Sequence, residues 1–308
     1  MRGFDLKRVQ GAALCFGLLA AGLGTNQAVA ASALCAAPAS HRYAGAVSHY
    51  IADLKTSFPE HTSYSAATAL TEANYRTVLA GLSRNVGVDG IRLPIVVAYA
   101  SAANYPELYK DIFAYARSIG LLIYASPLAV GKSPFAGWSD DRYATWLATY
   151  AAAFRPDALS PFNEAGMDEA RMTSIVTKLR AKLNLSLLLV GPDRQFVVGT
   201  LRDVDEHSGL ASLFDIVASH NSDRDITATA GNWSHLVAAV PSGKPVWSSE
   251  NPAGWAAGQI QGLPGLDQAV AGGVQGLVIW KAKPTLIDDA GQATTKACEI
   301  AAHLMGGS

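Results

Sequence analysis

The chain has 308 residues and half of them are hydrophobic, so it is long enough for one large α/β barrel or for two ordinary domains. Its formal net charge is −1, and the lysines and arginines form no run or patch. This balance argues against nucleic acid or an anionic lipid surface as a partner, and it favours a neutral or weakly charged substrate.

Residues 1–30 predict a signal peptide that is removed on export. Basic residues precede an apolar run from Gly11 to Gly24, and the segment ends in the small residues Ala28-Val29-Ala30, which suit a signal peptidase. The run is short for a membrane span, and a buried first helix or a membrane anchor is the alternative interpretation. We expect a secreted or periplasmic mature chain with a net charge of about −3 and no membrane attachment.

The cysteines suit an exported protein. Cys15 lies in the leader, so the mature chain keeps Cys35 and Cys298, one near each of its ends. A single disulfide between these two residues is the natural inference for an oxidising compartment, and two free buried thiols are the alternative.

Eight apolar runs have the length and composition of strands, and most are followed by an amphipathic helical stretch. The strands are expected at 43–48, 89–97, 121–126, 158–163, 185–190, 214–219, 245–249 and 276–280. The helices are expected at 72–82, 105–118, 141–154, 167–183, 196–206, 233–240, 266–271 and 294–305. Strands that are apolar on both faces and alternate with helices are typical of a parallel sheet covered by helices.

The number of these units favours a closed barrel over an open sheet. No Gly-x-Gly-x-x-Gly follows the first strand, so a dinucleotide-binding fold has little support. No linker or low-complexity tract divides the mature chain. We therefore predict an α/β fold with a single (β/α)8 TIM barrel over residues 31–308, in which Gly191-Pro192 ends the fifth strand.

Polar residues stand at the expected carboxyl ends of the strands, which is where such barrels place their active sites. Asn163 and Glu164 end the fourth strand, and Glu250 follows the seventh. The other candidates are Arg92 on the second strand, His220 after the sixth and Trp280 at the end of the eighth. Two glutamates at strand ends suggest paired carboxylate chemistry.

Asn163-Glu164 and Trp247-Ser-Ser-Glu250 resemble the acid/base and nucleophile motifs of the retaining glycoside hydrolases of clan A, and their spelling is nearest to families 30 and 59. The resemblance implies that Glu164 is the acid/base and Glu250 the nucleophile. It also implies that Asn163 hydrogen-bonds the 2-hydroxyl of the sugar and that Trp280 offers a flat apolar wall to the sugar. Relatives usually add a β-sandwich to the barrel, and we expect none here.

Retention requires two carboxyl groups about 5 to 5.5 Å apart, and strands four and seven face each other across a barrel mouth. We expect an apolar surround and the second carboxylate to keep Glu164 protonated, while Arg92 and hydroxyl donors hold Glu250 ionised. Arg92, Asn163, His220 and Trp280 should then line one pocket with both glutamates.

Each candidate also has a structural interpretation: Asn163 and Glu164 as a helix cap, Arg92 as an ion pair, and His220 and Trp280 as core. A structural role is at least as plausible for Asp193, Tyr99, Trp138, Lys281 and Trp255. A metal-dependent hydrolase would need paired histidines, and His49 stands alone, so we expect no metal and no other cofactor.

The sequence thus predicts a secreted, monomeric retaining glycoside hydrolase that acts on β-glycosidic bonds of an oligo- or polysaccharide. A noncatalytic carbohydrate-binding barrel that keeps the cleft without turnover is the alternative. The sugar, the linkage and the choice between endo and exo action are left open.

Overall fold

A computed structural model of the chain describes residues 46–99, 101–128, 137–164, 166–183, 186–221, 225–241, 243–251 and 263–304. The predicted signal peptide, Cys35 and Trp255 lie outside these residues. None of the helices in the described ranges is long and apolar enough to cross a membrane.

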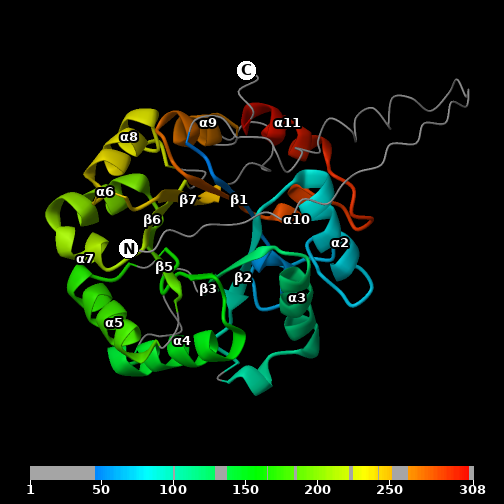
Figure 1. Cartoon of the computed structure of the whole chain (residues 1–308), viewed down its shortest axis with the longest axis horizontal. Coiled ribbons are helices and arrows are strands. Elements are labelled where there is room, and N and C mark those ends of the chain that lie inside the picture. Colours follow the sequence, from blue (N-terminus) through cyan, green and yellow to red (C-terminus); the bar gives the residue numbers. More distant parts are fainter. Residues whose placement is uncertain are drawn as a thin grey trace, which may run out of the picture.

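Eight parallel strands form a closed barrel in chain order, at the centre of the view in Figure 1. They are β1 His49–Asp53, β2 Gly90–Ile95, β3 Leu122–Pro127, β4 Ala158–Leu159, β5 Leu188–Arg194, β6 Ile216–His220, β7 Val246–Asn251 and β8 Gly276–Ile279. The barrel closes where Ile51 of β1 pairs with Val278 of β8. The predicted (β/α)8 TIM barrel is confirmed.

Helices surround the barrel and follow the strands along the chain (Figure 1). They are α2 Tyr75–Gly81, α3 Glu107–Ser118, α4 Asp140–Phe154, α5 Glu169–Lys182, α6 Val197–Glu206, α7 Ser208–Ser212, α8 Ala230–Ala239, α9 Leu263–Ala271, α10 Ala282–Thr285 and α11 Thr295–Leu304. Short 3-10 helices span Lys55–Ser57 (η1) and Ala102–Asn104 (η3), and a π-helix spans Leu82–Val86 (η2). Ser139, Asp168 and Thr229 cap α4, α5 and α8 through their side-chain oxygens, as polar residues at helix starts commonly do.

Three strand predictions are wrong in ways that affect the site. The fourth strand is Ala158–Leu159 instead of 158–163, so Asn163 and Glu164 lie in the segment that follows it. The first strand is His49–Asp53 instead of 43–48, so its carboxyl end is Asp53. The fifth strand passes through Gly191-Pro192 and ends at Arg194. A proline interrupts a sheet because it lacks an N–H donor, but here the pairing with β6 shifts register between Pro192 and Arg194, and such irregularities tolerate proline.

A layer of apolar side chains fills the inside of the barrel below the site. It consists of Ile51, Tyr124, Ala158, Val190, Ile216, Ala218, Trp247 and Val278. Trp247 lies against the backbone of Gly276 on β8, where an added Cβ would lie 2.4 Å from the indole. The Tyr124 ring meets Trp247 edge-on and supports the Arg92 guanidinium 5.0 Å above its centroid. The core therefore forms the floor of the candidate site.

Candidate active site

The two predicted glutamates lie together at the mouth of the barrel, Glu250 near the carboxyl end of β7 and Glu164 in the segment that follows β4. A carboxylate oxygen of Glu164, a carboxylate oxygen of Glu250 and a ring nitrogen of His220 all lie within 4.8 Å of one another. The side chains of Glu164 and Glu250 remain 13% and 17% exposed, so both are accessible to a ligand from solvent. Glu164 has a left-handed backbone, with φ +51°, and its N–H donates to the carbonyl of Asp193. Backbone strain of this kind clusters at functional sites.

Glu250 is surrounded by cations. Lys55 Nζ and Arg92 Nη1 each donate to Glu250 Oε2 at 3.2 Å, and His220 Nδ1 lies 3.8 Å from the same oxygen. Burial alone would raise the pKa of Glu250, but Lys55, His220 and Arg92 outweigh it and lower the pKa to about 2. Glu250 is therefore ionised at neutral pH. Arg92 acts as predicted, while Lys55 takes the place expected for hydroxyl donors.

Arg92 is fully buried and points into the barrel mouth, as the predicted register requires. Its Nη2 donates to Asn163 Oδ1 at 2.9 Å and to Asp193 Oδ2 at 3.0 Å, and its Nη1 lies 3.4 Å from Asp53 Oδ2. Burial opposes the charge, but Tyr124 and the neighbouring carboxylates raise the pKa of Arg92 above its ordinary value. The structure therefore makes Arg92 both an ion-pair centre and a contact of Glu250.

The amide of Asn163 is held in one orientation. Its Oδ1 accepts from Lys55 Nζ at 2.8 Å as well as from Arg92, and an oxygen is the only end of the amide that two cations can share. The Nδ2 group makes no hydrogen bond within the described part of the chain. Asn163 therefore keeps an N–H donor for a ligand.

His220, at the end of β6, connects Glu164 with a carboxylate deeper in the barrel. Its Nδ1 lies 3.2 Å from Glu164 Oε1, and its Nε2 lies 3.4 Å from Asp193 Oδ1. Burial alone would lower the pKa of His220, but Glu250 and Asp193 outweigh it and raise the pKa to about 9. The ring is therefore an imidazolium at neutral pH and carries a proton on each nitrogen.

Asp193 is fully buried at the irregular end of β5, with φ +60°. Burial would raise its pKa, but His220 and Arg92 hold the pKa below the ordinary value. Its Oδ1 also accepts from the Ser249 hydroxyl. An ionised Asp193 thus fixes both His220 and Arg92.

The two glutamates therefore have unequal surroundings. Glu250 contacts Lys55 and Arg92, whereas the Glu164 carboxylate has His220 as its only charged or hydrogen-bonding side-chain partner among the described residues. The expected apolar surround of Glu164 is wrong on the side of His220, because the segment after β4 brings Glu164 to the end of β6. Unequal surroundings are what separate a nucleophile from an acid/base.

Trp280 follows β8 directly, and its main-chain N–H donates to the main-chain carbonyl of Asn251 on β7. This hydrogen bond places Trp280 at the same end of the barrel as Glu250. Lys281 Nζ lies 4.4 Å from the centroid of the indole, in a cation–π contact. The Lys281 ammonium therefore covers one face of the Trp280 ring.

The sequence motifs do not point to Lys55 or Asp53, and they leave a structural role at least as plausible for Asp193. Lys55 is 2% exposed and Asp53 is fully buried, and the main chain N–H of Lys55 donates to Asp53 Oδ1. The available signal was the pattern Tyr50-Ile-Ala-Asp-Leu-Lys55, in which charged residues directly follow an apolar run. Burying a charge in that position costs free energy, and this cost marks such a residue as a candidate for the functional site.

Glu164, His220 and Glu250 are close enough to share a metal ion in principle. Two cations already contact the Glu250 carboxylate, however, and His220 carries a positive charge of its own. A divalent cation would meet three positive groups here, so the donor set does not suit one.

No known family model and no curated protein matches the sequence. Solved structures of glycoside hydrolases resemble the barrel. A β-mannanase from Streptomyces thermolilacinus has a TM-score of 0.59 and 14% identity, covering 85% of this chain and 91% of the mannanase. A family GH2 β-galacturonidase from Eisenbergiella tayi has a TM-score of 0.54 and 12% identity, covering 86% of this chain and 54% of the other.

A fungal endo-β-N-acetylglucosaminidase of glycosyl hydrolase family 18 has a TM-score of 0.53 and 12% identity, covering 85% of this chain and 99% of its own. The barrel is of the kind found in glycoside hydrolases. The likeness at this identity is one of fold, and the three names specify different sugars, so the chemistry must be argued from the site.

Proposed function

We propose that this chain is a retaining glycoside hydrolase of clan A, akin to families 30 and 59, that cleaves β-glycosidic bonds of a polysaccharide. The observation that carries the proposal is the pair Glu164 and Glu250, with carboxylate oxygens within 4.8 Å and unequal electrostatic surroundings. Retaining enzymes hold their carboxyl groups about 5 to 5.5 Å apart, whereas inverting enzymes leave about 6.5 to 9.5 Å for a water molecule.

In the first step Glu250 attacks the anomeric carbon of the bound sugar. The bond from that carbon to the leaving-group oxygen breaks, and Glu164 gives its proton to this oxygen. Lys55 and Arg92 keep Glu250 ionised before the attack. The product is a glycosyl ester on Glu250, and Glu164 becomes a carboxylate next to the His220 imidazolium.

In the second step water enters where the leaving group was. Glu164 accepts a proton from the water, the oxygen attacks the anomeric carbon, and the ester bond to Glu250 breaks. Two inversions return the sugar to its original configuration. The free Nδ2 of Asn163 is a suitable donor to the 2-hydroxyl of the sugar, because its Oδ1 is already occupied by Lys55 and Arg92.

The leader and the cysteines support export, and we propose that the mature protein starts at Ala31 in the periplasm or outside the cell and acts as a monomer. N-terminal sequencing of the protein purified from the native host would test the cleavage point. A product that still starts at Met1 would contradict it.

The experiment that tests the function uses Glu250→Ala on an aryl glycoside. Activity should fall by several orders of magnitude because no covalent ester can form. Added azide should restore turnover, since it fits the space left by the carboxylate, and should yield a glycosyl azide of inverted configuration. Glu299→Ala, a change at an exposed position on α11, is the control and should be fully active.

Wild-type substrates should first be found with a panel of β-mannans, β-galactans, xylans, β-glucans and bacterial exopolysaccharides, read by product chromatography. If wild-type protein binds a polysaccharide but never releases a shorter product, the noncatalytic binding barrel is correct and the hydrolase proposal is wrong.

A further inference from the structure

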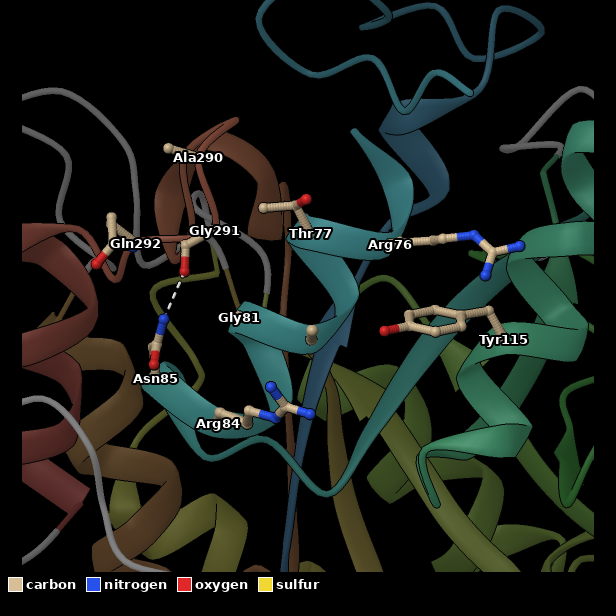
Figure 2. A pocket seen from close by; sticks show the side chains of 10 residues that line it. Arg76, Thr77, Gly81, Arg84, Asn85, Tyr115, Ala290, Gly291 and Gln292 are labelled. Atoms are coloured by element: carbon tan, nitrogen blue, oxygen red, sulfur yellow. Dashed lines mark hydrogen bonds between the residues drawn. The ribbon is translucent and has the colours of Figure 1, made fainter. Parts of the chain in front are cut away.

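A cavity that is open to solvent lies in the outer helical layer, away from the strand ends at the mouth of the barrel. It has a volume of about 380 Å³ and is lined by α2, η2, α3 and the turn at 288–292, with Arg76, Arg84, Asn85 and Tyr115 among its walls (Figure 2). Cavities of this size are at the lower end of the range for small-ligand sites.

Two arginines give this cavity a positive charge. Arg76 donates to the hydroxyl of Tyr75 at 2.9 Å, and its guanidinium lies 5.3 Å from the ring centroids of Tyr75 and Tyr115. Arg84 is exposed and makes no ion pair or hydrogen bond within the described ranges. In the view of Figure 2 the Arg76 guanidinium lies beside the Tyr115 ring, and the Arg84 guanidinium lies on the other side, beyond the hydroxyl end of the ring.

No acidic residue lines the cavity in the described part of the molecule. The acids of the neighbouring turn have other partners: Asp288 Oδ1 accepts from the N–H of Gln292, and Asp289 Oδ1 accepts from Asn74 and pairs with Lys283 at 2.9 Å. The two arginines, both exposed to solvent, therefore meet no carboxylate among the described residues that line the cavity.

The backbone of the cavity is held in a defined shape. Gly81 packs directly against the turn, where an added Cβ would lie 2.8 Å from Gly291 Cα. Asn85 Nδ2 donates to the Gly291 carbonyl at 2.6 Å. Arg84 and Asn85 belong to the π-helix η2, and π-turns are rare and frequent at functional sites. This fixed frame distinguishes the cavity from two arginines that merely share a surface.

We propose that this cavity binds the carboxylate of a uronic acid unit in an oligosaccharide, as a carbohydrate site separate from the catalytic cleft. A guanidinium matches the planar carboxylate, while Tyr115, Thr77 and the Gln292 side chain offer partners to sugar hydroxyls. The choice of a sugar as the carrier of the carboxylate rests on the proposed function, and the anion site itself does not.

The test is calorimetric titration of Glu164→Gln, which lacks the proposed proton donor and keeps Glu250 between its cations, with trigalacturonate at low ionic strength. Arg76→Gln combined with Arg84→Gln should weaken binding by about tenfold or more, since it removes two charge-assisted contacts. Arg202→Gln, which removes an exposed arginine from α6, should bind as before. Binding should also weaken in 0.5 M salt because exposed charges are screened.

Three outcomes would overturn the inference. The first is that the double variant, shown by circular dichroism to be folded, binds trigalacturonate as tightly as its parent. That result would place the ligand in the catalytic cleft. The second is that mannotriose binds as tightly as trigalacturonate, and the third is that inorganic phosphate does. Either result would show that the site has no preference for a uronate. The titration measures no turnover, so its result does not depend on whether the protein is a hydrolase. A negative titration would likewise leave the hydrolase proposal unchanged.

Discussion

Lys55 Nζ donates to Asn163 Oδ1 at 2.8 Å, joining the residues after β1 to the segment that follows β4. The same ammonium lies 3.2 Å from Glu250 Oε2 on β7. One buried cation therefore sets two properties of the site: the orientation of the Asn163 amide and the charge of Glu250. The catalytic proposal depends on both.

Lys55→Met should weaken catalysis without removing either glutamate. Loss of the nearest cation raises the pKa of Glu250, so the acidic limb of the pH profile of kcat/KM should move to higher pH by about one unit or more. At neutral pH kcat/KM should fall about tenfold or more, because Asn163 also loses a charged donor. Lys110→Met on α3 is the control. An unchanged acidic limb would show that Lys55 does not act on Glu250.

Arg92→Met should destabilise the fold. The change leaves the buried carboxylates of Asp53 and Asp193, and the partly exposed carboxylate of Glu250, without their shared cation, and breaking a buried pair costs about 3 to 5 kcal/mol. Urea denaturation at pH 7 would measure the loss in free energy of unfolding. Arg202→Met, at a site more than half exposed, should change it by less than about 0.5 kcal/mol. Equal stability of the two variants would refute the buried ion-pair network.

His220 should make the protein less stable as the pH rises. Its pKa is raised from 6.5 to about 9 in the folded state, so its stabilising effect is complete below pH 6.5 and is lost as the pH passes through 9. The loss is on the order of 3 kcal/mol. Denaturation curves at several values between pH 6 and pH 9.5 should show this decline in the wild type and a weaker one in His220→Gln. Parallel declines in both proteins would contradict the assignment.

The barrel could be predicted from the sequence because its signals are repeated. Eight apolar runs alternate with helical stretches, and an error in one run does not change the class of the fold. Glu164 and Glu250 could be predicted because each follows an apolar run and each belongs to a recognisable motif. Errors of a few residues in the strand bounds leave these two at the barrel mouth.

The supporting charges could not be found in the same way. Placing the first strand at 43–48 left Asp53 and Lys55 in a loop, whereas the strand ends at Asp53. Reading Gly191-Pro192 as a stop left Asp193 outside the sheet, although the shift in register lets the strand continue past the proline. Which carboxylate pairs with which cation depends on side-chain geometry across five strands, and periodicity carries no information about it.

The proposed disulfide has one end at Cys298, on α11, and the other at Cys35, which lies outside the described residues. Closing so long a loop stabilises a protein by about 5 kcal/mol in the chain-entropy model. We expect no titratable thiol in the denatured, unreduced mature protein and a lower melting temperature after reduction. Cys298→Ser alone should reproduce the effect of reduction. Two thiols reactive toward Ellman's reagent would refute the disulfide.

Glu164→Ala should separate the acid/base from the nucleophile by its dependence on the leaving group. A dinitrophenyl group leaves without a proton, so the variant should still form the glycosyl ester on Glu250 from such a glycoside, while natural polysaccharide should be cleaved several orders of magnitude more slowly. Hydrolysis of the ester should become the slow step, because the base that activates water is missing. A burst of dinitrophenol should then appear.

Azide needs no base, so it should speed release of the sugar from Glu164→Ala and yield a glycosyl azide of retained configuration, opposite to the product of Glu250→Ala. His220 stays in place in both variants, so this difference reports on the glutamates alone. If Glu164→Ala lowers the activity on the dinitrophenyl glycoside and on the polysaccharide to the same extent, Glu164 does not supply the proton. If both glutamate variants keep near-normal turnover, the paired-carboxylate mechanism is wrong.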